Sequence, residues 1–287
     1  MNPTPTSAFV AALVGLLVLG VTQGEAAERQ VRGGFALQMN PIGVRADLEA
    51  SWRRRLSPST HPLLREAHLA VGVGDQLTPA SNQTQAWIEV SPLSILDIRA
   101  GVTGVAYFGT FGNLVGLKGY GSDFTDDARK ALEEGATSGV GRRFFVSPAL
   151  KFKAGRVSVR TTADFESWKV KDAPGPVYYE PNRGTLLDAR GDSLVSGSNV
   201  VLCDLSKGGA ETVRVGVLHD YLKVWDAPSN RRQRVGPLAL IKLGEGGLGG
   251  RDRVLSVAVL KYLEAPNRTG VGGFVSLTMA LGGRSKR

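Results

Sequence analysis

The residue types that could perform acid–base chemistry are few in this sequence. Its histidines are His61, His68 and His219. Asp220 follows His219 directly, but adjacent side chains on a β-strand point to opposite faces, so this carboxylate cannot orient that imidazole as a Ser-His-Asp triad requires. The sequence therefore predicts no catalytic residue, and we expect that the protein is not an enzyme.

The sequence also lacks the residue spacings that are typical of metal and phosphate sites. Cys203 is the single cysteine, which excludes a Cys/His zinc cluster and is typical of a small residue in a strand. The acidic stretch 124–134, "FTDDARKALEE", lacks the ligand spacing of a calcium loop. Residues 244–250, "GEGGLGG", follow a strand but open no helix, which favours a flexible turn over a phosphate cradle. We expect no metal ion and no cofactor.

The net charge narrows the classes of partner. The chain has 287 residues, of which 42% are hydrophobic and 21% are charged, and its formal net charge is +9. The basic residues are spread along the chain without the aromatic-basic clusters of nucleic-acid modules, so we expect no nucleic-acid partner. An anionic lipid surface, an anionic solute and a merely solvated surface all remain compatible with this charge.

The first segment has the features of an export signal. Residues 8–21 form an apolar run, shorter than the roughly 20 residues that a spanning helix needs. Gly24 and Ala26 supply the small-x-small pair of a cleavage site. We predict a signal peptide over 1–26 and a mature domain over 27–287 with a net charge of about +10, since the signal contains one acidic residue. The first residues carry no Lys or Arg, so an uncleaved anchor is the alternative.

Most of the remaining sequence alternates between apolar and polar residues. From Ile42 to Arg53 one parity is apolar and the other is charged or small, which predicts a β-strand with one apolar face. We expect strands near residues 34–40, 43–54, 66–76, 84–91, 94–108, 143–154, 156–170, 193–204, 211–225, 233–243, 252–263 and 270–282.

Alternation fits a soluble sandwich with its apolar face inside, or a membrane barrel with its apolar face outside. Many runs are about ten to fifteen residues long, which suits strands that cross a bilayer better than soluble strands. Aromatic residues near the run ends suggest interfacial girdles, and these are Trp52, Trp87, Tyr107, Phe108, Phe144, Phe145, Trp168, Tyr221, Trp225 and Tyr262. We therefore predict an all-β fold, a single closed antiparallel transmembrane β-barrel of about 12 strands, within a range of about 10 to 14.

The connections support this architecture, because one end of such a barrel has short turns and the other long loops. The short turns 91–94, 154–156, 206–210 and 244–250 are expected at one end, and the long segments 109–142 and 171–192 at the other, with 227–230 and 265–268. The first strand pair departs from this rule, because 40–43 is short on the long-loop side and 55–65 is long on the turn side.

Over residues 33–282 the chain resembles in pattern the outer-membrane β-barrel proteins of Gram-negative bacteria, which are porin-like in the broad sense. The resemblance implies localisation in the bacterial outer membrane, exposure of the long loops outside the cell, and contact with outer-membrane lipid and lipopolysaccharide. One feature departs from the pattern. The last strand ends at Leu281 and continues "GGRSKR", whereas such barrels often close on an aromatic residue.

The loop 109–142 contains a helix signal. Thr125 can cap it, Asp126 and Asp127 suit its positive end, and Gly135 can end it in a left-handed conformation. A helix here could cover the barrel mouth, fold inward and narrow the lumen, or contact a partner.

On each predicted strand, every second residue is polar, and these residues would line the lumen. The charged residues expected there are Arg45, Asp47, Glu49, Arg53, Asp97, Arg99, Lys151, Lys153, Arg160, Asp164, Glu166, Arg214 and Lys242. Eight are basic and five acidic, which favours a narrow passive pore with a weak preference for small anionic solutes. Pairing across strands would instead give a filled structural or adhesive barrel. An enzyme facing the outer leaflet is the second alternative.

Overall fold

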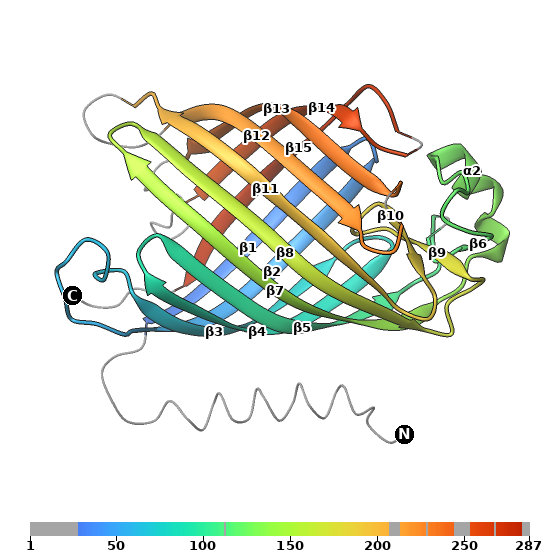
Figure 1. The fold of residues 1–287 in the computed structure, drawn as a ribbon, viewed down its shortest axis with the longest axis horizontal. Coiled ribbons are helices and arrows are strands. Elements are labelled where there is room, and N and C mark those ends of the chain that lie inside the picture. Colours follow the sequence, from blue (N-terminus) through green and yellow to red (C-terminus); the bar gives the residue numbers. More distant parts are fainter. Residues whose placement is uncertain are drawn as a thin grey trace, which may run out of the picture.

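The computed structural model describes residues 28–111, 113–206, 213–227, 229–243, 253–266 and 268–282. Within them, twelve antiparallel strands close into one barrel (Figure 1). Around the barrel these are β1 (Glu28–Met39), β2 (Gly43–Arg55), β3 (His68–Leu77), β4 (Ser81–Leu93), β5 (Leu96–Tyr107), β7 (Gly139–Ala154), β8 (Val157–Lys171), β11 (Asp192–Asp204), β12 (Val213–Val224), β13 (Arg231–Lys242), β14 (Arg253–Glu264) and β15 (Val271–Gly282), which pairs with β1. The predicted fold class is confirmed. The predicted signal peptide lies outside the described residues.

Large apolar side chains cover the outer face of the barrel. The exposed ones on the strands include Phe35, Leu37, Leu48, Ile88, Ile98, Phe144, Val146, Leu150, Phe152, Phe165, Val201, Val217, Val259 and Val275. Each exposed Å² of apolar surface costs roughly 25 cal/mol in water, so a continuous apolar wall of this kind is suited to a hydrocarbon surrounding. No helix among the described residues is long and apolar enough to cross a membrane.

The two ends of the barrel differ in their connections. The long-loop end carries the segments 108–138 and 172–191, and the opposite, short-turn end carries the turns 94–95 and 155–156 (Figure 1). Segment 56–67, which also joins strands at the short-turn end, is the expected exception. The other predicted short turns, 206–210 and 244–250, lie outside the described residues except for Ser206.

A second, three-stranded sheet lies at the long-loop end. It contains β6 (Gly116–Leu117), β9 (Val177–Glu180) and β10 (Thr185–Asp188) in the order β10-β9-β6, and we call it the cap sheet (Figure 1). Segment 171–192 was predicted as a long connection, and its β9–β10 hairpin was not predicted. The short helices α2 (Asp126–Ala131) and η1 (Glu133–Gly135) lie in the other long loop.

The helix begins as predicted and ends earlier. The Thr125 Oγ1 accepts a hydrogen bond from the Ala128 N–H at 3.3 Å, which confirms the cap. Gly135 does not have a positive φ, contrary to the prediction. The Leu132 N–H donates to the Arg129 carbonyl at 3.1 Å, and this i→i+3 bond tightens the chain into the 3₁₀ turn before Gly135 is reached.

Half of the expected girdle aromatics are inside the barrel, which corrects the prediction. Trp87, Tyr107, Phe145, Trp168 and Tyr262 are buried on the inner face, whereas Phe108, Phe144 and Trp225 are exposed. Small residues on adjacent strands make room for the inner rings. A Cβ at Gly72 would lie 2.3 Å from the Trp87 ring, so this glycine lets the indole lie flat on the wall.

We expect that Gly72→Val lowers the stability of the barrel by about 1–3 kcal/mol, because the added side chain collides with Trp87 and with the Ala50 carbonyl at 2.9 Å. The midpoint of urea unfolding in detergent measures the effect. Gly43→Val is the matched control, since a Cβ there meets nothing within 4 Å. Equal midpoints for the two variants would show that the Trp87 ring can move away.

Candidate functional site: the barrel lumen and its cap

Contacts across the barrel identify the inner face. The Asn182 Nδ2 donates to the Ser81 Oγ on β4 at 3.0 Å, and the Arg232 NH1 on β13 donates to the Arg183 carbonyl at 2.8 Å. β4 and β13 lie on opposite sides of the ring of strands. The turn between β9 and β10 therefore lies inside the barrel, and the faces that carry Ser81 and Arg232 line the lumen.

The strand registers extend this face around the whole barrel. Asp47 pairs with Gln76, Lys151 with Arg160, and Arg214 with Leu240, and both members of each pair point inward. All the predicted lumen charges fall on this face, and these are Arg45, Asp47, Glu49, Arg53, Asp97, Arg99, Lys151, Lys153, Arg160, Asp164, Glu166, Arg214 and Lys242.

Several of these charges pair across strands. Arg99 bridges Glu49 at 3.2 Å and Glu89 at 2.9 Å, and Lys151 binds Asp97 at 2.8 Å. The network ties β2, β4, β5 and β7 together on one side of the lumen. Glu89 was not among the predicted residues, although it shares the polar parity of β4.

His68 and Ser91 extend this network. The His68 Nε2 lies 3.1 Å from a Glu89 oxygen and 3.3 Å from the Ser91 Oγ. The Ser91 hydroxyl donates instead to Asp97 at 2.5 Å, and the His68 and Ser91 side chains are both buried. A serine whose proton is given to a carboxylate is not activated by the imidazole, so the group joins strands rather than forming a nucleophile–base pair.

Water reaches the lumen toward the short-turn end. The side chains of Arg53 and Lys151 are exposed by 39% and 37%. Charges with this much contact with solvent do not form a dry, salt-bridged core. This part of the lumen is a wet vestibule.

Part of the opposite inner wall is apolar, which corrects the expectation of a polar lumen all around. Leu202, Leu218, Leu238, Ala258 and Leu260 form one buried cluster across β11, β12, β13 and β14. They lie on neighbouring strands at matching heights, so they bury one another instead of facing water. The charges on this side pair with one another nearer the cap, where Asp220 on β12 binds Arg234 on β13.

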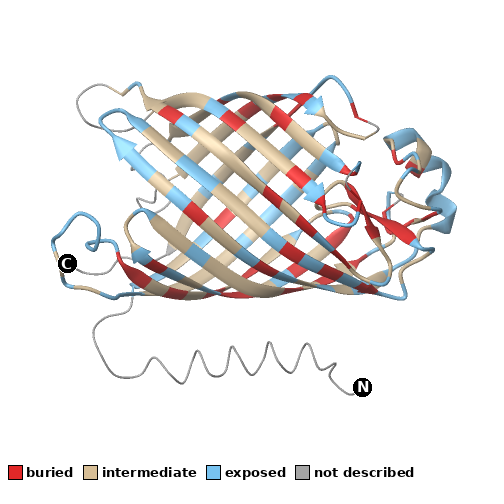
Figure 2. Ribbon diagram, viewed as in Figure 1, coloured by how far each residue is buried: buried red, intermediate tan, exposed pale blue. Residues whose placement is uncertain are grey.

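The cap sheet fills the long-loop end, where buried residues gather in Figure 2. Tyr178 and Leu187, on one face of the sheet, pack on the inner-wall residues Val105, Tyr107, Trp168, Val170, Leu194, Leu222 and Val224. The other face, with Val177, Tyr179 and Leu186, packs on Val115, Leu117 and Phe124. Segment 172–191 therefore folds inward, while the α2 side of the other long loop covers it from outside.

A buried ion pair holds the cap turn to the wall. The Arg183 Nε donates to Glu166 at 3.0 Å, and its NH2 donates to the other carboxylate oxygen. The Trp168 Nε1 donates to the same carboxylate at 2.7 Å, and Arg143 lies 3.7 Å away. Glu166 is only 1% exposed, so Arg183 is its principal counter-charge.

Glu180 is a second buried carboxyl of the cap turn. It accepts hydrogen bonds from the Tyr107 hydroxyl at 3.2 Å and the Asn182 Nδ2 at 2.9 Å. Burial raises the pKa of Glu180 above its ordinary value, against the opposing effect of the hydrogen bond from Asn182. The turn is thus attached to the wall at two points, where Glu180 accepts from Tyr107 and where Arg183 binds Glu166.

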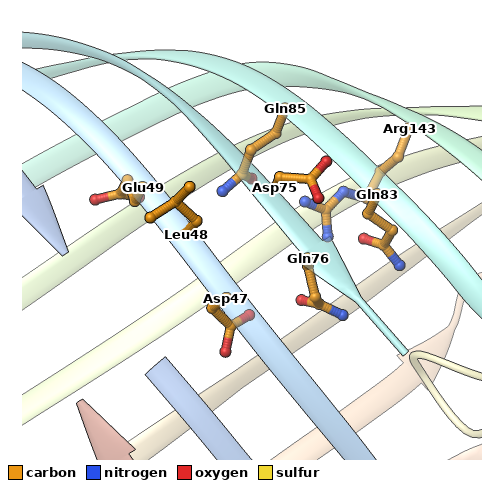
Figure 3. Close-up of a pocket in the computed structure, with 8 residues that line it drawn as sticks. All are labelled: Asp47, Leu48, Glu49, Asp75, Gln76, Gln83, Gln85 and Arg143. Carbon is orange, nitrogen blue, oxygen red and sulfur yellow. The ribbon is translucent and has the colours of Figure 1, made fainter. Parts of the chain in front are cut away.

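A cavity of about 230 Å³ lies among residues of β2, β3, β4 and β7 (Figure 3). The Gln76 Nε2 on the cavity wall donates to the Asn182 Oδ1 in the cap turn at 3.3 Å, so the cavity lies next to this turn. The inner-face residues around it are Asp47, Glu49, Gln76, Gln83, Gln85 and Arg143. The glutamines and Arg143 were not predicted, although Gln83 and Gln85 share the parity of Glu89 and Arg143 shares that of Lys151.

The described residues contain no group of three His, Cys, Asp or Glu side chains that could hold a metal ion. Cys203 is a free thiol in β11.

No protein-family model matches the sequence, and no curated protein matches it. Solved structures do. The NanC porin is 5% identical, with 87% of this chain and 98% of that chain covered and a TM-score of 0.42. The translocator domain of the autotransporter NalP from Neisseria meningitidis is 10% identical, with 96% of this chain and 96% of that chain covered and a TM-score of 0.38. The beta domain of the Bordetella autotransporter BrkA is 12% identical, with 89% of this chain and 99% of that chain covered and a TM-score of 0.44. The predicted fold, a closed antiparallel barrel, is shown by the strand pairing of this chain itself.

Proposed function

We propose that the protein is an outer-membrane barrel that forms a narrow passive passage, held shut at its long-loop end by the cap sheet. The observation that carries this proposal is the contrast in exposure along the lumen. Arg53 and Lys151 are 39% and 37% exposed in the vestibule, whereas Glu166 is 1% exposed beneath the cap. A wet lumen that ends at a separately folded sheet is suited to opening and closing.

A weak preference for anions accompanies the passage. Among the lumen charges predicted from the sequence, eight are basic and five acidic. Their field reaches roughly 8 Å at physiological salt, which is comparable to the radius of a narrow pore. Small anionic solutes are therefore the proposed passengers, and no catalytic role is proposed.

The competing function is a filled structural or adhesive barrel. The leucine cluster on β11–β14 and the tight packing of the cap favour it. The two functions differ in whether ions ever cross.

Recording of the purified protein in planar bilayers tests the proposal. We expect rare, brief openings and a reversal potential in a salt gradient that indicates a modest anion preference, because the basic residues exceed the acidic ones. Silence in the full chain and in a variant without the cap hairpin would favour the filled barrel. A preference for cations would contradict the proposed selectivity.

The proposed lipid partner has a candidate contact on the outer face. A groove of about 330 Å³ at the long-loop end is lined by Arg142, Phe144, Lys169 and Arg190, and Arg142 pairs directly with Lys169. Phe144 is 50% exposed on the same outer face. Three cations beside a lipid-facing ring are suited to the phosphate groups of lipopolysaccharide, provided that this end faces outward.

We expect that Arg142→Gln with Lys169→Gln weakens retention of lipopolysaccharide by about 30-fold, since each cation near a lipid surface contributes about 1 kcal/mol. Quantitative mass spectrometry of lipid bound to the purified protein measures this. Arg65→Gln, an exposed cation at the short-turn end, is the control and should retain wild-type levels. Equal retention by all three proteins would exclude this groove.

A further inference from the structure

The cavity next to the cap turn contains a buried donor without an acceptor. Gln83 is 5% exposed, and among the described residues its Nε2 has no hydrogen-bond partner. In Figure 3 its amide lies with Gln76, Gln85 and Arg143 around the cavity. Trp87, on the same inner face of β4, also has an Nε1 without a partner in the described part of the chain. Buried donors are satisfied in nearly all proteins, so the unpaired Gln83 amide on the wall of a cavity indicates a ligand.

The opposite side of the cavity supplies acceptors with little net charge. Asp47 is paired with Arg45 at 2.9 Å, and Glu49 with Arg99 at 3.2 Å. A carboxylate has about four lone-pair sites, so each can accept further hydrogen bonds while it stays paired. Arg143 also donates to the Thr103 hydroxyl at 3.0 Å. The cavity therefore combines amide donors with carboxylate acceptors, and its two inner-face carboxylates are compensated by Arg45 and Arg99.

We propose that this cavity binds a small, uncharged, polyhydroxylated solute of monosaccharide size. Each hydroxyl of such a solute donates to a carboxylate and accepts from an amide, which uses both halves of the site. The volume of 230 Å³ corresponds to about eight water molecules at liquid density, which accommodates one sugar ring and not a longer chain. The proposal rests on the proposed passage and goes beyond its anion preference, because it adds a binding site for a neutral solute directly behind the closure.

Saturation-transfer NMR with glucose as the probe tests the site, in an amine-oxide detergent that contains no sugar. We expect saturable binding to the wild-type protein and a Kd about 5- to 10-fold higher for Gln83→Met, because that change removes the amide while nearly keeping the volume. Gln83→Asn, which keeps an amide, should show a smaller loss. Gln38→Met is the matched control, since Gln38 is an exposed inner-face glutamine outside the cavity, and its Kd should be unchanged.

Three results would overturn the inference. These are no saturable signal with glucose, equal Kd values for the wild type and Gln83→Met, and tighter binding of glucuronate or inorganic phosphate than of glucose. The slower migration of boiled than unboiled protein on gels verifies that each variant is folded. The NMR measurement does not depend on conduction. Saturable, Gln83-dependent binding by a barrel that never conducts would reject the passage and keep the site, whereas conduction without binding would reject the site alone.

Discussion

Replacing the cap hairpin, residues 176–189, by a short Gly-Ser link should raise the conductance of the barrel about tenfold or more, because the hairpin is the part of the loops that enters the lumen. Tyr178 and Leu187 pack on the inner wall, and the turn bridges β4 and β13. The Ala189 N–H lies 3.0 Å from the Pro176 carbonyl, so a short link can join the ends without moving the wall. Single-channel recording measures the effect.

Removal of the helix segment, residues 125–134, is the matched control. Its side chains contact the outer face of the cap sheet, as Arg129 does over the Tyr179 ring at 4.2 Å. We therefore expect conductance within about twofold of the full chain, since a cover outside the constriction adds little resistance. An increase on removal of the helix, with none on removal of the hairpin, would mean that α2 is the barrier. No increase in either variant would mean that the wall itself fills the lumen.

The barrel could be predicted because its strands keep a strict period of two. Leu48 and Glu49 show the principle, since a shift of one residue would place the charge in lipid and the leucine in water. That alternation, together with run length, predicted about 12 strands and the parity of the charged residues expected in the lumen.

The aromatic residues were misplaced because their position along the strand was used and their parity was not. Trp168 shares the parity of Glu166, and Trp87 that of Glu89, so both point inward. The leucine cluster is a different case. In 254–263, "VLSVAVLKYL", both parities are apolar, and a period of two cannot tell a lumen leucine such as Leu260 from a lipid-facing one.

The hairpin of the cap sheet has a recognisable sequence pattern, but nothing in that pattern indicates where the hairpin lies relative to the barrel. "VYYEPNRGTLLD" places two apolar runs around a turn with Asn182 and Gly184, which is a hairpin pattern. Whether that hairpin stands outside the barrel or enters it depends on the contacts of Arg183 with Glu166 and Arg232. These depend on how the barrel closes, which no local pattern encodes.

Loss of the Arg183 side chain should be the point mutation that opens the passage most. In Arg183→Ala the Glu166 carboxylate stays buried, with Trp168 and with Arg143 at 3.7 Å as its remaining partners. Removing one partner of a buried ion pair costs about 3–5 kcal/mol, and the nearby Arg143 reduces this to about 2–3 kcal/mol. Because 1.4 kcal/mol is a tenfold change, the open probability in planar bilayers should rise about 30- to 150-fold.

Two further variants distinguish the effect of losing the Arg183–Glu166 ion pair from a general loosening of the loop. Arg190→Ala removes a cation from the same segment, but Arg190 is 91% exposed and its pair with Asp188 is a surface pair, so the open probability should not change. Glu166→Gln removes the charge that Arg183 neutralises. In that background Arg183→Ala should have a much smaller effect, because no unpaired carboxylate is left in the wall. An equal effect of Arg183→Ala in both backgrounds would show that the arginine holds the cap through its other contacts and not through Glu166.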